Sequence, residues 1–467
     1  MVASKSYKYW ILFVVCLSAA LGPFMGFSIN LALPHIAKDF DLSGVAQNWV
    51  VTTFLLSSAI FQIPFGRLAD IWGKRTVFIA GLVIFTLSSA GCCLPFNTST
   101  TLLIFRTLQG VSSAMIFSTN MAILTLVFPA KELGRAMGIN AAVTYTALAL
   151  GPLFGGVIIT HIGWEGVFVL IALLSLIACI GSFFVLKKKW AVAKGEPFDT
   201  LGAVLYAIAL CALIYGFSSL PQWWGYVLIA GGAIFMILFV RYEKYRRFPV
   251  FNVSLFFKNR SFSFSSVAAL LSYVATFPIS IFMSIYLQDV RGFDADYAGL
   301  ILVAYPIIQV VLSPVAGWLS DRMQPRYLAS VGLVVVALAL LLTAFLTPTS
   351  PVWYIFTLLL LMGGGFAAFV APNNKAIMSS VDRQHYSMAS AVTGTMRLSG
   401  QAFSMGIATM VFALYLGNQK ITPEVSAEFM QAMKLAFLIL TVVCVVGVYA
   451  SMARGKGRRI IRAEGIK

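Results

Sequence analysis

The chain has 467 residues, of which 60% are hydrophobic and 10% are charged, and its formal net charge is +17 at pH 7. Because soluble domains carry roughly 25% charged residues, this composition excludes an ordinary water-soluble protein. Apolar runs of about 20 residues recur along the chain, each long enough to cross a bilayer as a helix. A backbone in hydrocarbon must satisfy its own hydrogen bonds, and the short alternating strands of a membrane barrel are not seen, so we expect helices.

The apolar runs predict an all-α membrane protein with fourteen transmembrane helices. The expected ranges are 9–33, 47–66, 76–95, 100–126, 136–160, 164–186, 200–219, 224–241, 261–287, 298–316, 327–347, 352–372, 387–416 and 432–453. Most lysines and arginines fall on one side of the membrane if the N-terminus is cytoplasmic. We therefore expect an integral protein of the cell (inner) membrane with both termini in the cytoplasm. This bias accounts for the net charge without nucleic acid as a partner.

A short charged segment follows the second span and recurs after the tenth. Residues 64–75 read PFGRLADIWGKR, and residues 317–326 read GWLSDRMQPR. The copies match in pairs, with Gly73 present only in the first: Gly66 and Gly317, Leu68 and Leu319, Asp70 and Asp321, Arg75 and Arg326. Duplicated halves are typical of secondary transporters, whose substrate site lies between the halves.

The repeat suggests a division of the chain into four parts. We expect a six-helix bundle at 1–190, an inserted two-helix hairpin and cytoplasmic linker at 191–260, and a second six-helix bundle at 261–453. The basic tail at 454–467 is expected to contact anionic lipid headgroups.

Two arginines, Arg106 and Arg397, fall inside predicted spans. A charge there costs roughly 2.5–3.5 kcal/mol on insertion scales, so it usually serves a function. Helical spacing places polar side chains on the same faces. For single polar residues, a hydrogen bond between helices is the simpler interpretation, and Arg397 could instead cap carbonyls of a neighbouring helix. The polar candidates for a central substrate cavity are Arg106, Gln109, Asn120, Tyr145, Tyr273, Tyr305, Gln309, Asn373, Asn374, Arg397 and Gln401.

All sixteen acidic residues fall in predicted loops or at span ends. No carboxylate is then available at the membrane centre to neutralise a cation or carry a proton. Any proton coupling would use loop-edge acids such as Asp70, or the substrate itself. The six cysteines lie in or beside apolar spans as packing residues, and the three histidines are far apart. We therefore expect no metal and no cofactor.

Three motifs carry a family resemblance. The segment G-x-L-A-D-x-x-G-x-R at 66–75 resembles the signature loop of the major facilitator superfamily, and RTLQGVSSA at 106–114 resembles its span 4 motif. GINAAVTYTALALGPLFGG at 138–156 resembles its antiporter motif. Fourteen spans, NLALP at the end of span 1, and the segments APNNKAIMSS and SAVTGTMRLSGQ narrow the resemblance to the fourteen-span drug:proton antiporter family.

The resemblance implies the major facilitator fold, alternating access and two sets of gating residues. Asp70 would act as a latch, accepting hydrogen bonds from helix N-terminal amides of the opposite half and pairing with arginines. Its set is Gly66, Asp70, Gly73, Arg75, Gly317, Asp321 and Arg326. The antiporter motif would supply close helix contact and a hinge through Gly151, Pro152, Gly155 and Gly156. Topology anchoring and ordinary close packing are the alternatives for these two sets.

The chain departs from that family in span 1. Related antiporters resemble one another in having an Asp several residues before N-x-A-L-P, where this chain has Met25. Met25 and Asn30 join the expected substrate cavity. Two functions remain open: an exporter of amphipathic small molecules, proton-coupled or not, and a carrier of anionic or neutral amphiphiles such as lipids or organic acids. An enzyme or a channel is disfavoured, and we expect a monomer.

Overall fold

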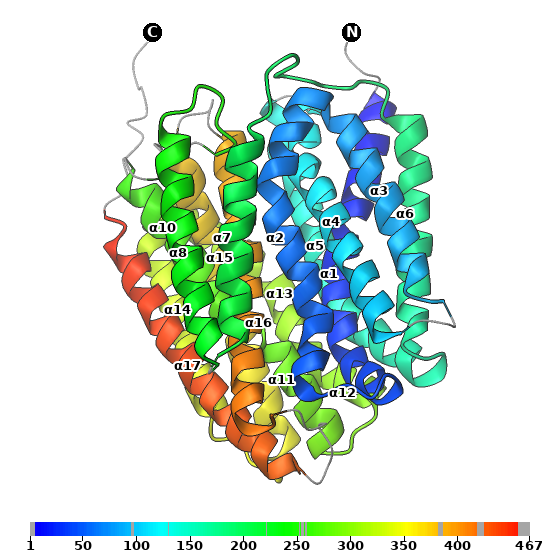
Figure 1. The fold of residues 1–467 in the computed structure, drawn as a ribbon, viewed down its shortest axis with the longest axis vertical. Coiled ribbons are helices and arrows are strands. Elements are labelled where there is room, and N and C mark those ends of the chain that lie inside the picture. Colours follow the sequence, from blue (N-terminus) through cyan, green and yellow to red (C-terminus); the bar gives the residue numbers. More distant parts are fainter. Residues whose placement is uncertain are drawn as a thin grey trace.

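The computed structural model describes residues 5–94, 98–128, 130–220, 222–251, 253, 256, 259–381, 386–417 and 425–455. Within these ranges, 14 helices are long and apolar enough to cross a membrane, and no strand occurs. The predicted all-α architecture with fourteen spans is therefore confirmed (Figure 1). Most of the predicted basic tail, residues 456–467, lies outside the described residues.

For description, we divide the spans in chain order into an N bundle of six, a hairpin of two and a C bundle of six. The N bundle contains α1 (Lys5–Asp39), α2 (Gly44–Trp72), α3 (Lys74–Gly91), α4 (Ser99–Val127), α5 (Ala130–His161) and α6 (Glu165–Val185). The hairpin consists of α7 (Thr200–Ser218) and α8 (Trp223–Lys244). The C bundle contains α10 (Arg260–Thr276), α11 (Ile279–Ile285), the π-helix η1 (Tyr286–Val290), α12 (Ala295–Leu302), α13 (Ala304–Arg322), α14 (Pro325–Thr343), α15 (Val352–Ser379), α16 (Tyr386–Tyr415) and α17 (Ser426–Ala453).

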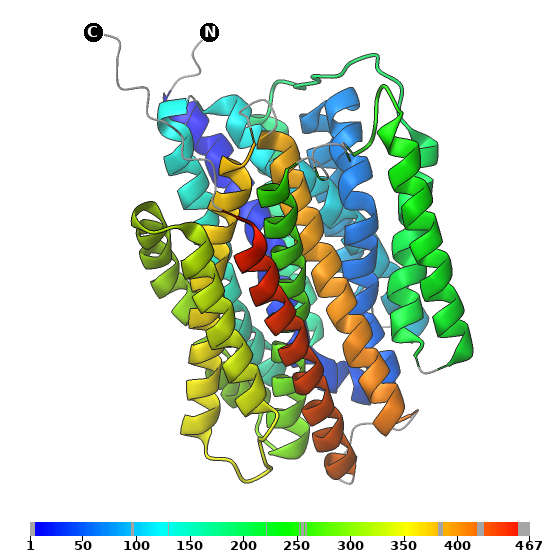
Figure 2. The same ribbon diagram turned by 90° about the vertical axis from the view of Figure 1, so that its left-hand side faces the viewer.

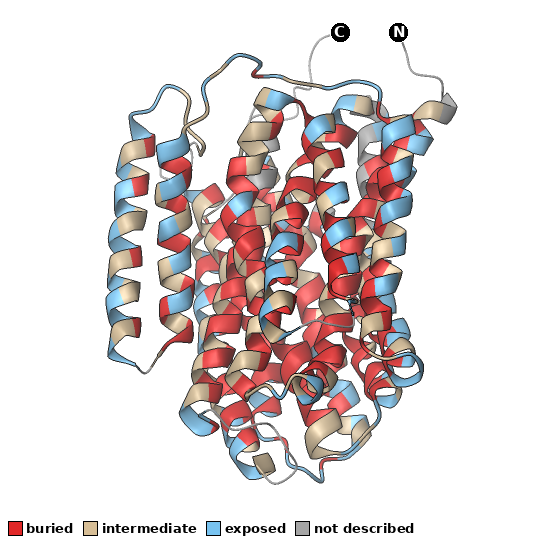
Figure 3. Cartoon of the chain, turned by 45° about the vertical axis from the view of Figure 1, so that its right-hand side comes forward, coloured by how far each residue is buried: buried red, intermediate tan, exposed pale blue. Residues whose placement is uncertain are grey.

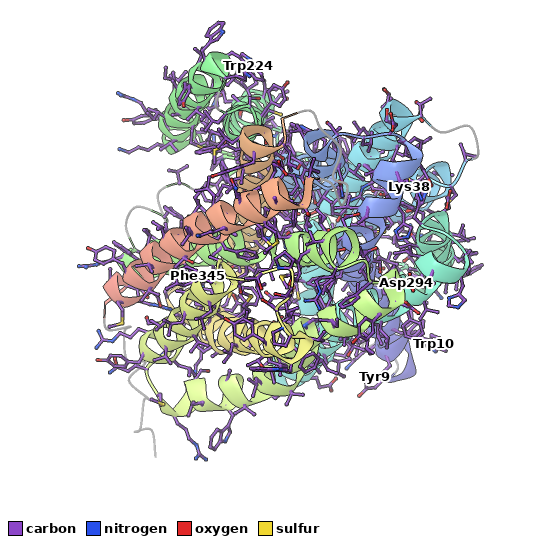
Figure 4. The ribbon with its side chains drawn as sticks, turned by 90° about the horizontal axis from the view of Figure 1, so that it is seen from below. Tyr9, Trp10, Lys38, Trp224, Asp294 and Phe345 are labelled. Atoms are coloured by element: carbon purple, nitrogen blue, oxygen red, sulfur yellow. The ribbon has the colours of Figure 1, made fainter. Side chains whose placement is uncertain are left out.

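The start of α1 and the end of α17 both lie toward the same end of the bundle, the upper end in Figure 1. We call this the terminal end and the opposite one the distal end. Figure 4 views the distal end, where Lys38 marks the end of α1 and Asp294 precedes α12. Two spans are built from consecutive pieces: α10, α11 and η1 form one, and α12 and α13 form the other.

The helices extend beyond the apolar runs that predicted them. Helix α2 continues to Trp72, so Asp70 lies in its last turn and not in a loop, contrary to the prediction. Only Gly73 separates α2 from α3, and its φ of 100° is a conformation that side-chain-bearing residues rarely adopt. The second copy behaves alike, since α13 continues to Arg322. Hydropathy locates the hydrocarbon-spanning part of a helix but not its polar ends.

The hairpin packs on the seam between the two bundles. Helix α7 contacts both α2 and α16, and Figures 2 and 3 show the pair standing at the side of the molecule. Tyr206, only 4% exposed, donates a hydrogen bond to the carbonyl oxygen of Ala59 on α2 at 3.3 Å. Its hydroxyl also makes a hydrogen bond with Ser399 on α16. One hydroxyl of the hairpin therefore touches both halves.

Candidate functional site

Arg397 of α16 lies among side chains from both bundles. Its guanidinium carbon is 5.2 Å from the ring centroid of Phe117 on α4. The hydroxyl of Tyr145 on α5 interacts electrostatically with Arg397 and Tyr273 and makes a side-chain hydrogen bond with Ser313 on α13. Five of the predicted cavity residues meet where the two bundles face each other, together with two additional aromatic neighbours. We define the central cluster as Phe27, Phe117, Tyr145, Tyr273, Tyr305, Gln309 and Arg397.

Aromatic rings and hydroxyls make up the rest of this cluster. Tyr305 of α13 makes side-chain hydrogen bonds with Thr276 and Gln309. Its ring stacks on Phe27 of α1, with centroids 6.2 Å apart and an interplanar angle of 22°. Such a surface offers flat apolar faces and a few hydrogen-bonding groups, which is the usual lining of a small-molecule site.

The charge of Arg397 has no acidic counterpart in the described part of the chain, since no Asp or Glu there forms a salt bridge with it. Arginine stays protonated at neutral pH, and the Phe117 ring provides attraction but no negative charge. The cluster is therefore electropositive, so an anion would gain a partner there and a cation would be repelled.

Arg106 has a different environment from Arg397. Its side chain is 1% exposed, and its Nε donates to the carbonyl oxygen of Val50 on α2 at 2.9 Å. Nη1 donates to Gln109 Oε1 at 2.7 Å, and Gln109 in turn donates to Ser89 Oγ on α3 at 2.8 Å. The structure thus places Arg106 and Gln109 inside the N bundle, as a link among α2, α3 and α4, and not with the central cluster.

Two of the remaining predicted cavity residues, Asn120 and Asn373, also bond within their own bundle. Asn120 Nδ2 donates to the carbonyl oxygen of Val15 at 2.9 Å, and Asn373 Nδ2 donates to that of Ser265 at 3.1 Å. Met25, at 1% exposed, belongs to the hydrophobic core. Helical spacing shows which residues share a face but not whether that face meets a cavity or another helix. Asn374 is exposed and Gln401 is half-buried.

Sequence reasoning missed the structural importance of Arg454, which follows α17. It is 3% exposed and donates from Nη1 to Asn373 Oδ1 at 3.2 Å and from Nε to the carbonyl oxygen of Ser451 at 2.7 Å. Burial lowers the pKa of Arg454 to about 10, which still leaves it protonated at neutral pH. Its position directly after the last apolar run was the available signal.

The two bundles meet closely toward the distal end. Asn30 Nδ2 on α1 donates to Ser280 Oγ on α11 at 2.6 Å, and Gln288 Nε2 on η1 donates to the carbonyl oxygen of Leu31 at 3.3 Å. Asn30 was predicted to line the cavity, and here it joins the two halves.

The antiporter motif lies in the same region, between α1 and α12. On the α1 side, Ser28 Oγ donates to the carbonyl oxygen of Gly151 at 2.9 Å, and a Cβ at Gly155 would lie 2.9 Å from Ser28 Oγ. On the α12 side, a Cβ at Gly156 would lie 2.6 Å from the carbonyl oxygen of Ala295.

The α12 side has its own glycine at this crossing. A Cβ at Gly299 would collide with the carbonyl oxygen of Pro152. Helix α5 is continuous from Ala130 to His161 with Pro152 inside it. We define the distal closure as the contacts of α1 and α5 with α11, η1 and α12. Gly299 was not predicted, and its only signal was a glycine within an apolar span.

At the terminal end, the first charged copy is tied to the linker that follows α6. Asp70 pairs with Lys74 in its own copy, and its carbonyl oxygen accepts from the backbone N–H of Ala193 at 2.9 Å. Arg67 pairs with Glu196. We call residues 186–196 the strap. In this structure Asp70 binds within the N bundle and the strap, and the described residues show no bond from it to the opposite half.

Other residues of the first copy follow the same arrangement. Arg75 Nε donates to the carbonyl oxygen of Leu186 in the strap. A Cβ at Gly73 would lie 2.6 Å from the carbonyl oxygen of Lys189, whereas one at Gly66 would lie 3.8 Å from Ser118 Cβ.

No such strap lies against the second charged copy in the part of the chain that the structure describes. A Cβ at Gly317 would meet no atom within 4 Å. Arg326 Nη2 donates to the hydroxyl of Tyr327 at 2.6 Å, and Lys375 Nζ donates to the carbonyl oxygen of Ser320 at 2.8 Å. The side chain of Asp321 lies outside the described residues. No group of three or more His, Cys, Asp or Glu residues in the described part could hold a metal ion.

The chain matches the Major Facilitator Superfamily model over residues 15–405 and again over 265–459. It is 28% identical to the riboflavin transporter RibZ of Clostridioides difficile, covering 94% of this chain and 96% of that protein. It is 28% identical to the multidrug resistance protein Stp of Mycobacterium tuberculosis, covering 86% and 76%. A bacterial homolog of the human lysosomal transporter Spinster, solved in an inward-facing and unoccupied conformation, superposes with a TM-score of 0.71 at 16% identity over 97% of this chain and 98% of that one.

Proposed function

The chain belongs to the major facilitator superfamily, and from this we propose that it is a monomeric secondary transporter that exports amphipathic small molecules by alternating access. Superfamily membership makes it an integral membrane transporter with the major facilitator fold. The direction of transport, the substrate class and the coupling are part of the proposal.

One observation carries the substrate part of the proposal: Arg397, which has no carboxylate partner among the described residues, lies in an aromatic cluster shared by both bundles. Phe117 and Tyr145 come from the N bundle, and Tyr273 and Arg397 come from the C bundle. A ligand bound there would contact both halves and could favour one arrangement of them over another, which is the requirement for coupling binding to alternating access.

The distribution of Lys and Arg supports a cytoplasmic terminal end. Under that orientation, the distal closure shuts the extracellular side in this structure. The latch role of Asp70 then belongs to the opposite state, in which the terminal end would be shut. In that state Asp70 would either keep or exchange its two present interactions, the ion pair with Lys74 and the backbone hydrogen bond to the strap.

The second candidate function is an uncoupled carrier of anionic or neutral amphiphiles. The lack of a described carboxylate around Arg397 favours it, because a proton-coupled exporter of cations needs an acid to bind either the proton or the cation. The similar proteins include both a multidrug resistance protein and a riboflavin transporter. Both candidates share the preference for anions or neutral molecules.

Flux measurements in proteoliposomes separate the two candidates. Purified protein is reconstituted, and the movement of matched anionic, neutral and cationic amphiphiles is followed with and without a pH gradient. Flux of the anion or the neutral molecule that rises with the gradient supports a proton-coupled exporter. The same flux without dependence on the gradient supports the uncoupled carrier. Flux of the cation alone would contradict both.

A further inference from the structure

Helices α14 and α17 enclose a groove on the outside of the C bundle, near the terminal end. The groove has a volume of about 320 Å³ and is lined chiefly by Tyr327, Val331 and Val334 of α14 and by Val448 and Met452 of α17. Figure 2 shows α17, in red, along the front of the molecule. Since Val331 is 60% exposed, the groove opens outward, where a membrane-spanning helix meets lipid.

The wall of this groove is apolar because its polar atoms are already bonded. Ser330 donates to the carbonyl oxygen of Arg326 at 2.7 Å and is paired with Ser451 Oγ at 2.8 Å. No acidic residue lines the groove. A hydrocarbon chain would fill such a space without leaving any buried polar group unpaired.

A positively charged side chain, that of Arg326, lies at the mouth of the groove. Arg326 is the second residue of α14, and its guanidinium contacts Tyr327, which lines the groove, through a 2.6 Å hydrogen bond and across the ring at 4.5 Å. Its Nε is buried and has no hydrogen-bond partner among the described residues. No described carboxylate forms a salt bridge with Arg326.

We propose that this groove is a binding site for an anionic membrane phospholipid, with one acyl chain between α14 and α17 and the phosphate at Arg326 and Tyr327. A phospholipid matches both features at once, since it joins an apolar chain to a negative headgroup at the depth where the spans end. The guanidinium can donate from Nε and Nη to phosphate oxygens. This site is separate from the central cluster and does not depend on the proposed transport function.

The location gives the site a consequence for the transporter. Arg326 matches Arg75 of the first charged copy, yet Arg75 donates to the strap and Arg326 faces the groove. A bound phospholipid would supply the second copy with a partner at the place where the first copy has the protein's own linker.

Native mass spectrometry of the purified full-length chain tests the proposal. The protein is titrated with dioleoyl phosphatidylglycerol or with dioleoyl phosphatidylcholine, which have the same acyl chains. Val334→Trp fills the groove, and Arg326→Gln removes the charge at its mouth. Leu338→Trp is the matched control, because Leu338 is 56% exposed on the same helix but does not line the groove.

We expect the wild type and Leu338→Trp to retain one phosphatidylglycerol molecule in preference to phosphatidylcholine. Val334→Trp should weaken binding of both lipids by about tenfold, and Arg326→Gln should abolish the preference while leaving phosphatidylcholine binding unchanged. Thermal unfolding checks that each variant is folded, and if Val334→Trp is not, Arg326→Gln decides alone. The proposal is overturned if Arg326→Gln keeps the preference, or if folded Val334→Trp binds like the wild type.

Discussion

The two copies of the charged motif have matching sequences and similar helix ends but different surroundings. In the first copy, Arg67 and Asp70 are joined to the strap through Glu196 and Ala193. In the second copy, the surroundings of Gly317 are open, and Arg326 bonds to its own neighbour Tyr327. The duplication explains why both copies end a helix in the same way. The linker to the inserted hairpin exists only beside the first copy, and it makes the two copies unequal.

The largest expected difference between the copies is at their glycines. Gly73→Ala should destabilise the protein by about 2 kcal/mol, because φ is 100° and the new Cβ would press on Lys189. Gly317→Ala should change stability by less than about 0.5 kcal/mol, since nothing lies within 4 Å. Chemical unfolding of both purified variants measures this. Equal losses of stability in the two variants would mean that contact with the strap does not make the two copies different.

The variant Gly299→Ala tests whether the distal closure stabilises the observed arrangement of the two bundles, rather than either charged copy. Its Cβ would collide with the Pro152 carbonyl oxygen, so this arrangement should lose about 1–3 kcal/mol relative to the opposite one. Distances between spin labels on α1 and α11 report the populations. We expect a shift toward separation at the distal end, with Gly26→Ala, whose Cβ would meet nothing within 4 Å, as control. An unchanged distance distribution would argue against the closure.

Asp70→Asn should slow transport by about tenfold, which corresponds to about 1.4 kcal/mol in a barrier, while folding and membrane insertion remain normal. The proposed latch needs a charged hydrogen-bond acceptor, and asparagine has the shape of aspartate but not its negative charge. Asp321→Asn should have a smaller effect, because its copy lacks the second glycine. Initial rates in proteoliposomes with equal amounts of protein give the comparison. If Asp70→Asn transports normally, the assignment of Asp70 as a latch is wrong.

A small effect is expected for Glu196→Gln, which breaks the pair with Arg67. The side chains of this pair are 16% and 36% exposed, so the loss of stability should stay below about 1 kcal/mol. Lys194→Gln is the control for the charge change, because Lys194 lies in the same segment but forms no salt bridge with any described residue. The transition midpoints of the two variants in chemical unfolding are compared. A drop of several kcal/mol for Glu196→Gln would show that the strap is far more important than its exposure suggests.

The sequence was sufficient for the fold because span positions depend on local hydropathy. Contacts between helices were harder to predict. Arg106 and Arg397 both looked like cavity arginines, yet Arg106 bonds to Val50 within one bundle, and only Arg397 meets the other bundle at Phe117. Asp70 was expected in a loop and lies in a helix, because a polar helix end carries no hydropathy signal. The contact of Gly299 with Pro152 could not be predicted without knowing which helices cross.

The most direct test concerns Arg397 in the central cluster, whose described residues include no carboxylate. Purified wild type, Arg397→Ala and Arg397→Lys are titrated with an anionic and a cationic fluorescent amphiphile of equal size. We expect the wild type to bind the anion about tenfold more tightly than the cation, Arg397→Ala to lose this preference, and Arg397→Lys to keep part of it. If the wild type prefers the cation, or if Arg397→Ala binds the anion as tightly as the wild type does, the assignment of the central cluster as an electropositive substrate site is wrong.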